Sequence, residues 1–486
     1  MKSIKHVIGG AEIDSADGAT FDDIDPYTQE AYATVALGGA KEADDAVRAA
    51  RKAFDEGPWP RMSFDERGKL IHKLADLMDQ HNEDLALADT RDMGKPVTAA
   101  KTKDVPRSAL NFRFFADHAR LAESQHLPSA TGHHTYVQHA PAGVVSAIAP
   151  WNYPLMLETW KVAPALAWGN TVVLKPAEDT PHSAYLLARL ALEAGIPDGV
   201  LNVVHGFGPG SAGEALTVNP AVDRITFTGE SGTGRAIARA AAANLTPLSF
   251  ELGGKGCNLV FDDADLDSAV SWSIEAAFGN AGQVCLAGSR LYVQQGVYDE
   301  FVARFADAAA ALRLGDPKDP ATKVGPLASQ EHYRKVTSYL DPEATGNAKV
   351  LGGGGAPGWF VRPTIVIDPP AHAPVLREEI FGPVVTVTPF TTEAEAVKLA
   401  NDTPYGLSAM LFTENLHRAH RVAGSLNSGN VWVNCFFVRD LRAPFGGFGD
   451  SGIGREGGAF SREFFTEART ITMRIALEVA PEVVTA

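Results

Sequence analysis

The sequence predicts a mixed α/β protein built on parallel sheets. Its 486 residues suffice for two or three domains and a large hydrophobic core. Through the middle of the chain, short apolar segments alternate with segments of helical apolar spacing. Alternation at this spacing implies right-handed crossovers between parallel strands. Two further segments, at 133–141 and 469–479, alternate polar and apolar residues as exposed strands do.

The first half of the chain contains one such alternation. Residues 41–57 and 66–94 have the apolar spacing of amphipathic helices. Strand-like and helix-like segments then follow one another at 170–176, 183–195, 199–206, 211–219, 223–229 and 234–244. Because a doubly wound sheet of this kind binds a dinucleotide, we expect a Rossmann-like cofactor domain over 1–122 and 142–253.

A second alternation begins near residue 254 and predicts a second α/β domain over 254–449. Its strand-like and helix-like segments lie at 257–263, 265–282, 289–295 and 298–312. No helix follows the glycine run at 352–355, so we expect a plain loop there. We expect the strands within 123–141 and 466–486 to form a small β extension for oligomerisation. They would pair with each other or with another subunit of a homodimer or homotetramer.

Composition restricts the partners and the compartment. A net charge of −16 argues against nucleic acid or an anionic membrane as partner. The three cysteines form no C-x-x-C pair, which argues against a disulfide framework or a zinc site and fits a reducing cytoplasm. We expect no metal site. The chain has no signal-like start and no apolar run of about 18 residues, so we expect neither a signal peptide nor a membrane span.

Two glycine-rich loops are candidates for binding a pyrophosphate. The loop at 208–213 matches G-x-G-x-x-G after a strand, but Pro209 removes one backbone donor. The loop at 229–234 ends a strand and opens a helix, where free amides attract phosphate, but Glu230 adds negative charge. The pattern alone does not choose between the two loops.

Three other residues have both a structural and a functional interpretation. Lys175 and Glu178 follow a strand, where a carboxylate accepts hydrogen bonds from ribose hydroxyls and repels a 2′-phosphate. They would equally suit a solvated loop. Cys285 lies among Gly, Ala and Asn, and taken alone a lone cysteine is more often a small buried residue, an interpretation that we keep for Cys257 and Cys435.

Seven stretches taken together resemble one family. They read APWNYPL (149–155), KPAEDTP (175–181), FTGESGTG (227–234), FELGGK (250–255), GQVCLAGSR (282–290), EEIFGPV (378–384) and PFGGFGDSGIGRE (444–456). Their order and spacing are those of the NAD(P)-dependent aldehyde dehydrogenase superfamily, and the resemblance covers essentially the whole chain. It implies a soluble enzyme that oxidises a small-molecule aldehyde to a carboxylic acid.

The resemblance implies a nucleophile, oxyanion donors and a base. Cys285 matches the thiol that attacks the aldehyde carbon. The side-chain amide of Asn152 and the backbone N–H of Cys285 match the oxyanion donors. Glu251 matches the base that activates water to hydrolyse the thioester, and Lys161 belongs to the same catalytic set. A CoA-acylating relative typically lacks this base, and a non-catalytic structural relative usually lacks the nucleophile or the base. No histidine lies in the partner motif that a cysteine hydrolase would need.

The resemblance also assigns the cofactor residues and selects the loop at 229–234 for the pyrophosphate. Lys175 and Glu178 match residues at the adenosine ribose, Glu379 matches the carboxylate at the nicotinamide ribose, and Phe381 lies beside the ring. Gly208 becomes at most an adenine wall. The remaining cofactor positions are Trp151, Gly229, Ser231, Gly234 and Leu252. Glu178 favours NAD, and use of NADP stays open.

Two arginines suggest the class of aldehyde. Arg439 precedes the last family stretch, where relatives with apolar substrates carry an aromatic residue, and Arg107 lies on the expected opposite wall. Two guanidinium groups suit a substrate carboxylate. The pair resembles the branch of 2-hydroxymuconic and 2-aminomuconic semialdehyde dehydrogenases. Alternatively, Arg439 pairs with Asp440 or another local acid and does not reach the substrate, which is then a general aliphatic, aromatic or betaine-type aldehyde. The other expected substrate residues are Tyr153, Trp160 and Phe445.

Overall fold

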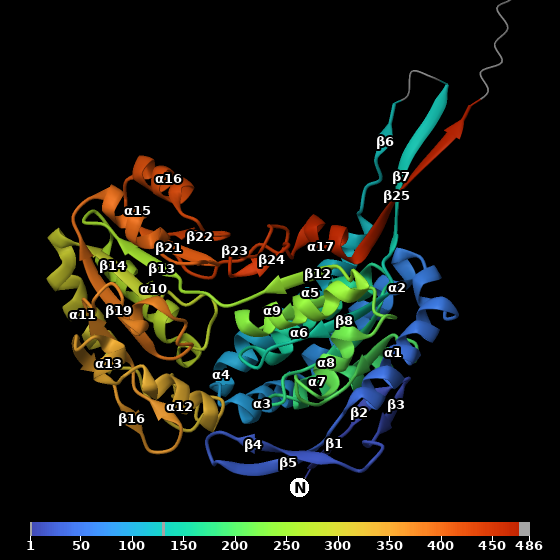
Figure 1. The fold of residues 1–486 in the computed structure, drawn as a ribbon, viewed down its shortest axis with the longest axis horizontal. Coiled ribbons are helices and arrows are strands. Elements are labelled where there is room, and N and C mark those ends of the chain that lie inside the picture. The colour runs from blue at the N-terminus through green and yellow to red at the C-terminus, as the bar shows by residue number, and fades with distance from the viewer. Residues whose placement is uncertain (1, 129–131, 476–486) are drawn as a thin grey trace, which may run out of the picture.

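The structure is a computed structural model that describes residues 2–128 and 132–475. Figure 1 shows two α/β lobes side by side, with a narrow β arm that projects from one of them. The part of the expected C-terminal strand at 476–486 lies outside the described residues. No helix of the described residues is long and apolar enough to cross a membrane.

An eight-stranded sheet forms the centre of the first lobe, in the order β24-β12-β11-β8-β9-β10-β2-β3. Its strands are β2 (His6–Ile8), β3 (Ala11–Ile13), β8 (Val144–Ile148), β9 (Thr171–Lys175), β10 (Leu201–Val203), β11 (Arg224–Thr228), β12 (Leu248–Glu251) and β24 (Gly452–Ile453). The five strands from β10 to β12 are parallel, and the outer ones pair antiparallel. The predicted doubly wound sheet is therefore present.

The sequence analysis missed the central strand of this sheet. It took the segment at 170–176 as the first strand, but β8 precedes it and lies between β9 and β11. All five residues of β8 are buried, and a short apolar run ending at Pro150 gives no alternation by which to recognise a strand. The strand order reverses at β8, so the carboxyl ends of β8 and β11 border the crevice where such sheets bind ligands.

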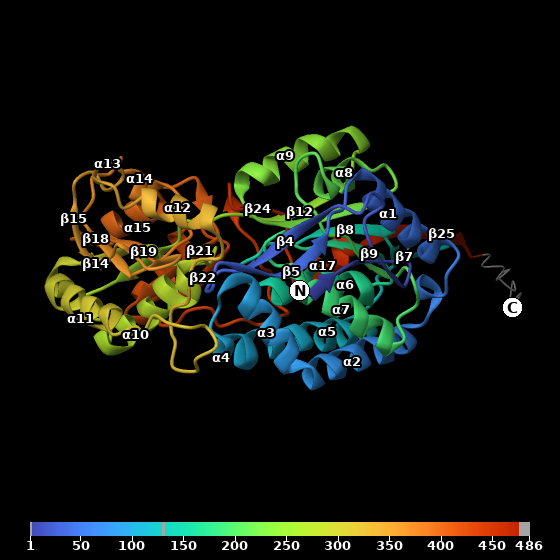
Figure 2. The same cartoon turned by 90° about the horizontal axis from the view of Figure 1, so that it is seen from below.

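Helices cover both faces of this sheet, as Figure 2 shows. One face is covered by α1 (Ala40–Asp55), α8 (Ala212–Val218) and α9 (Ser231–Ala241). The other is covered by α2 (Phe64–Gln80), α3 (Asn82–Met93), α5 (Val105–Arg120), α6 (Pro154–Ala167) and α7 (His182–Ala194). Alternate β8 residues enter the two cores, Val145 on the α5–α6 side and Val144 on the α1–α8 side.

A seven-stranded sheet forms the second lobe, in the order β15-β18-β19-β14-β13-β21-β22. Its strands are β13 (Cys257–Val260), β14 (Arg290–Gln294), β15 (Lys349–Gly352), β18 (Thr364–Ile367), β19 (Val384–Phe390), β21 (Ser408–Phe412) and β22 (Asn430–Val433). Its helices include α10 (Leu266–Phe278), α11 (Tyr298–Ala310), α15 (Glu393–Asn401) and α16 (Leu416–Ser425). All strands but the edge strand β15 pair in parallel. The chain passes from the first sheet to the second between Glu251 and Cys257.

The glycine run at 352–355 is only partly the plain loop that we expected. Gly352 ends β15, and Gly355 begins β16 (Gly355–Ala356), which pairs with β17 (Phe360–Val361). The backbone pairing there uses hydrogen bonds that the residue types do not reveal. The other short elements are β1 (Lys2–Ile4), β4 (Thr20–Asp25), β5 (Glu30–Ala36), α4 (Val97–Ala99), a π-helical turn (Ala100–Asp104), α12 (Gln330–Ser338), α13 (Pro342–Thr345), α14 (Pro374–Arg377), β20 (Tyr405–Gly406), β23 (Phe448–Gly449) and α17 (Gly458–Phe465).

The β arm contains β6 (His126–Leu127), β7 (His133–Pro141) and β25 (Thr466–Arg474). β7 and β25 pair antiparallel along their whole length, from Thr466 opposite Pro141 to Arg474 opposite His133. The two outlying strands that we expected thus pair with each other. β25 is an edge strand with mostly exposed side chains, and it leaves one row of backbone groups unpaired within the chain.

Candidate active site

A left-handed turn after α10 positions Cys285. Asn280 and Ala281 have φ of 52° and 54°, and Gly282 follows with φ of 71°. A Cβ on Gly282 would lie 2.2 Å from the backbone oxygen of Gly382, so this position needs glycine. The turn brings the loop that carries Cys285 against the end of β8.

Asn152 is tied to this loop. Its Nδ2 donates to the backbone oxygen of Gln283 at 2.9 Å, and its own backbone oxygen accepts from Asn280 Nδ2 at 2.8 Å. Asn152 is 3% exposed. Since an amide nitrogen carries two hydrogens, the second stays available beside Cys285, where an oxyanion would need a donor.

The thiol of Cys285 is protonated in this resting arrangement. Loss of solvation, together with the negative charges of Glu379 and Glu251, raises its pKa from 9.0 to about 12. Cys285 is still partly exposed, so a substrate can reach it. A nucleophile with such a pKa needs a nearby base.

Glu251 is suited to be that base. It ends β12, is buried, and has no hydrogen-bond partner among the described residues for either carboxylate oxygen. Burial and the adjacent charge of Glu456 raise its pKa well above the usual value, while Lys161 opposes the shift. A Cβ on Gly446 would come within 2.9 Å of Glu251 Oε1, so glycine there leaves room for the carboxylate.

Lys161, which the resemblance places in the catalytic set, is held by two buried side chains. Its buried ammonium donates to Glu456 Oε1 and to Thr226 Oγ1, both at 3.1 Å. The charges of Lys161 and Glu456 act on the pKa of Glu251 in opposite directions. Sequence reasoning missed Glu456, although it ends the last family stretch. The signal that could have pointed to Glu456 was the presence of a carboxylate within a stretch shared with the family.

The loop at 229–234 leaves the first turn of α9 open for a phosphate. Gly234 packs so closely that a Cβ there would meet Leu252 Cδ2 at 2.7 Å. The Ser231 hydroxyl donates to the backbone oxygen of Asp450 at 2.9 Å. Glu230 is exposed and pairs with Lys335 at 3.2 Å, away from the loop. The objection that Glu230 raised in the sequence is thereby removed.

The loop at 208–213 satisfies its own backbone donors. The amide of Gly213 donates to the backbone oxygen of Phe207 at 3.0 Å, and the amide of Gly210 donates to Glu214 Oε2 at 2.7 Å. The amide of Gly210 would have to be released from this carboxylate before a phosphate could bind there. Gly208 is thus part of a closed loop at the end of β10.

The other expected cofactor residues border the crevice at the switch point. Lys175 Nζ lies 3.5 Å from Glu178 Oε2, and the Glu178 side chain is 40% exposed and so accessible to a ligand. Glu379 Oε1 accepts from the Gly254 amide at 2.8 Å, and burial raises the pKa of Glu379 to about 7. Phe381, at a left-handed φ of 60°, lies edge-on to Trp151 with ring centres 5.3 Å apart.

Arg107 and Arg439 meet at Trp160. Their guanidinium carbons lie 5.6 and 5.2 Å from the centre of the Trp160 ring, and Arg439 also lies 3.8 Å from that of Phe445. Desolvation lowers the pKa of Arg107 to about 10, and desolvation together with the charge of Arg107 lowers the pKa of Arg439 to about 10. Arg439 Nη2 is buried without a hydrogen-bond partner among the described residues.

The alternative pairing of Arg439 with Asp440 is wrong. Asp440 instead accepts from Arg442, with Nη2 to Oδ2 at 2.6 Å, on the exposed surface. Tyr153 contacts a buried lysine. The Nζ of Lys95 lies 3.5 Å from the centre of the Tyr153 ring, and Lys95 is paired with buried Asp104. Sequence reasoning missed Lys95, since a lysine after a helix gives no sign of burial.

Comparisons with known proteins agree with this geometry. The family model described as aldehyde dehydrogenase family matches residues 13–471. A 2-hydroxymuconic semialdehyde dehydrogenase of Pseudomonas sp. (strain CF600) is 49% identical, over 98% of this chain and 100% of the relative. A 2-aminomuconic 6-semialdehyde dehydrogenase of Pseudomonas sp. is 44% identical, over 99% and 100%. An NAD+ complex of an aldehyde dehydrogenase from Bacillus cereus superposes with a TM-score of 0.95 at 39% identity, over 98% of this chain and 97% of that one.

Proposed function

The chain belongs to the aldehyde dehydrogenase family, and on this premise we propose that it oxidises a carboxylate-bearing semialdehyde of the muconic type, with NAD as hydride acceptor. The observation that carries the substrate class is the partly buried Arg107–Arg439 pair. Relatives at 49% and 44% identity that are named for muconic semialdehydes support the same class.

The two arginines favour a carboxylate because they are partly buried and neither forms an ion pair with a carboxylate of the described residues. Two like charges beside one Trp160 ring repel each other, and an unpaired Arg439 Nη2 is costly to bury. A substrate carboxylate would neutralise both and accept paired hydrogen bonds. Asn111 Oδ1 accepts from Arg107 Nε at 3.0 Å and leaves the terminal nitrogens of Arg107 for the substrate.

Residues of the chain supply the base, the nucleophile and the oxyanion donors of the reaction. Glu251, as a carboxylate, takes the proton of the Cys285 thiol, and the thiolate sulfur bonds to the aldehyde carbon. The aldehyde oxygen becomes an oxyanion that accepts from Asn152 Nδ2 and from the Cys285 amide. NAD, when bound, accepts the hydride that leaves this carbon, so that a thioester on Cys285 results. Glu251 gives up the thiol proton to solvent and is a carboxylate again. It then removes a proton from water, whose oxygen attacks the thioester carbon, and the C–S bond breaks to leave the acid and the Cys285 thiolate.

The residues around the crevice fit NAD. The open first turn of α9 suits a pyrophosphate, and Gly234 lets the helix approach Leu252. The Glu178 carboxylate, held by Lys175, suits two ribose hydroxyls and repels the 2′-phosphate of NADP. Glu379 offers a second carboxylate for the other ribose. We infer NAD as the preferred cofactor, and a comparison of kcat/KM for NAD and NADP tests this.

The substrate proposal is tested by initial rates of NADH formation. The 2-hydroxymuconic semialdehyde is compared with hexanal, with and without CoA. A kcat/KM preference of at least about tenfold for the acidic semialdehyde, with no need for CoA, is the expected result. A preference for hexanal would overturn the substrate class and leave the aldehyde dehydrogenase activity standing.

We also infer that the β arm joins subunits into a homodimer or homotetramer and that the enzyme works in the cytoplasm. The exposed edge of β25 supports the first inference. The second is supported by the three free cysteines, because free thiols persist in a reducing compartment. Light scattering of the intact protein and of a variant with Thr470→Pro on β25 tests the assembly. A proline there breaks the ladder, so the assembly mass should fall.

A further inference from the structure

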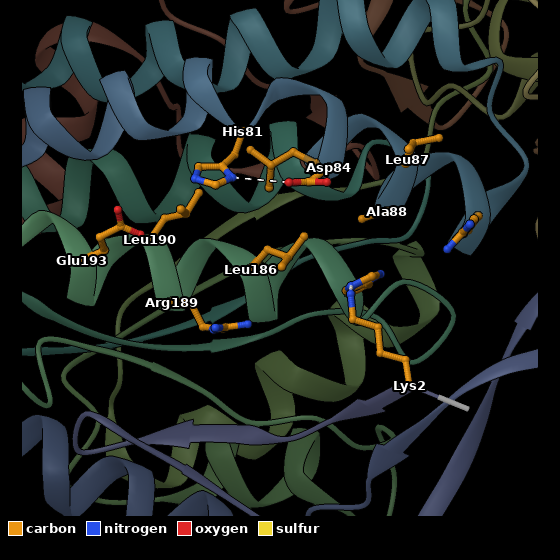
Figure 3. Close-up of a pocket in the computed structure, with 12 residues that line it drawn as sticks. Lys2, His81, Asp84, Leu87, Ala88, Leu186, Arg189, Leu190 and Glu193 are labelled. Atoms are coloured by element: carbon orange, nitrogen blue, oxygen red, sulfur yellow. Dashed lines mark hydrogen bonds and ion pairs between the residues drawn. The ribbon is translucent and has the colours of Figure 1, made fainter.

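A second cavity lies away from the active site, between α3 and α7. It has a volume of about 560 Å³, within the usual range of small-molecule pockets. Figure 3 shows side chains of two facing helices around it, with Leu186 and Leu190 between them and Lys2 at one side. Its apolar floor consists of Leu85, Ala88, Leu186 and Leu190.

Two cations in this cavity have only uncharged contacts. Lys2 Nζ contacts Nε2 of His182, and burial lowers the pKa of His182 to about 3, so this imidazole is neutral. The guanidinium of Arg91 lies 5.8 Å from the centre of the Tyr32 ring. The third cation, Arg189, is already paired with Glu12 at 3.2 Å. The cavity therefore offers two positive charges to a ligand.

The cavity also contains acidic groups, which argues against a simple anion as ligand. Asp84 lies on the α3 side and contacts only His81, with Nδ1 to Oδ2 at 3.3 Å, and Glu193 lies on α7. Asp92, behind His182, accepts from the Tyr32 hydroxyl and the His182 amide, and burial raises its pKa well above the usual value. The cavity lining therefore carries both positive and negative side chains.

We propose that this cavity binds a zwitterion with an apolar body, of the class of an α-amino acid with an apolar side chain. The ligand's carboxylate lies at Lys2 and Arg91, and its ammonium group lies at Asp84. Its side chain covers the leucine floor. The ligand's carboxylate meets two cations that form no ion pair with a carboxylate of the described residues, its ammonium group meets a carboxylate that contacts only a histidine there, and the apolar surface is removed from water.

The test is calorimetric titration of the intact, NAD-saturated enzyme with three probes. L-phenylalanine carries both charges, 3-phenylpropionate lacks the ammonium group, and 2-phenylethylamine lacks the carboxylate. Phenylalanine should bind once per chain, and each of the other two should bind at least about tenfold more weakly. Equal binding of 3-phenylpropionate and phenylalanine would replace the proposal by a plain anion site, and no binding of phenylalanine would overturn it.

Variants locate the binding. Arg91→Gln and Asp84→Asn should each weaken phenylalanine binding about tenfold, and Leu186→Trp should abolish it by filling the cavity. Matched controls at exposed positions, Lys349→Gln and Glu343→Gln, should leave it unchanged. All five variants should keep NADH formation, since none touches the active site. If the Arg91 and Asp84 variants bind phenylalanine like the parent, the ligand lies elsewhere and the proposal fails.

Discussion

Arg107 and Arg439 lie over the same aromatic ring, with guanidinium carbons 5.6 and 5.2 Å from the centre of Trp160. The two cations come from distant parts of the chain, α5 and the segment after β22. They are held together by aromatic faces rather than by carboxylates, since Phe445 contacts Arg439 at 3.8 Å. Such a pair is costly without a ligand, which makes it the most informative target for mutation.

Replacing Arg439 with alanine should raise KM for an acidic semialdehyde about tenfold or more and change KM for hexanal by less than about threefold. The charge-assisted hydrogen bonds are lost only for the substrate that carries a carboxylate. Arg442→Ala is the matched control, because Arg442 is exposed and bound to Asp440. Equal effects of Arg439→Ala on both aldehydes would contradict the role in specificity.

Replacing Glu251 with glutamine should separate the two halves of the reaction. Without a base for water, kcat should fall by about 10²-fold or more. Rapid mixing should show a burst of NADH close to one per active site but slower than in the parent, because the Cys285 thiol has lost its base and must lose its proton to solvent, while the thioester, once formed, persists. Mass spectrometry of the quenched enzyme should find the acyl adduct on Cys285. Steady turnover at the parental rate would contradict this assignment.

Replacing Asn152 with alanine removes the side-chain donor beside Cys285. Loss of one oxyanion donor costs about 10²- to 10³-fold in kcat in other enzymes, and we expect a loss of that size. The Asn152 amide also ties down the Gln283 carbonyl, so circular dichroism and the melting temperature must show that the fold is kept. A fall in KM alone, with kcat unchanged, would contradict the role as donor.

Alkylation of Cys285 should be slow at neutral pH and should still rise above pH 9. Desolvation disfavours the thiolate and raises the thiol pKa from 9.0 to about 12, so the reactive fraction grows as pH increases toward that value. The measurement is the rate of iodoacetamide labelling of Cys285 by peptide mass spectrometry, with Cys285→Ser as control. A plateau below pH 8 would show that the resting thiol is already activated.

Glu158 makes stability depend on pH. It is 0% exposed, neither oxygen has a hydrogen-bond partner among the described residues, and burial raises its pKa well above 4.5. When the folded-state pKa of a carboxyl is raised, its contribution to the free energy of unfolding is fully present below its unfolded pKa of about 4.5. This contribution is lost as pH rises from that value toward the folded-state pKa. The loss amounts to about 1 kcal/mol for each pH unit.

Glu158→Gln should therefore stabilise the protein more at pH 8 than at pH 5. The amide has a similar shape and needs no proton to be buried neutral. The measurement is the difference in melting temperature between variant and parent at the two pH values, with exposed Glu343→Gln as control. A difference that is the same at both pH values would mean that Glu158 is not protonated on folding.

The amino-acid pattern determined the strand and helix alternation, the doubly wound sheet and the two outlying strands, but it left open whether those strands pair with each other or with another subunit. These features rest on local periodicity and on a few rules of connection. The family stretches also named Asn152, Glu251 and Cys285 as the residues to look for. The choice between the two glycine-rich loops also depends on the folded structure, because backbone amides of the loop at 208–213 are engaged in hydrogen bonds. No residue type shows this.

Tertiary structure alone decided which charged groups have partners. The sequence pattern does not reveal β8 as a strand, because both of its faces are buried. In the structure β8 lies between β9 and β11, at the point where the strand order reverses. Lys161 meets Glu456 across nearly 300 positions of sequence, and Asp440 takes Arg442 rather than Arg439. Burial and charge depend on what the folded chain brings within a few ångströms, and a sequence written in one dimension does not contain those distances.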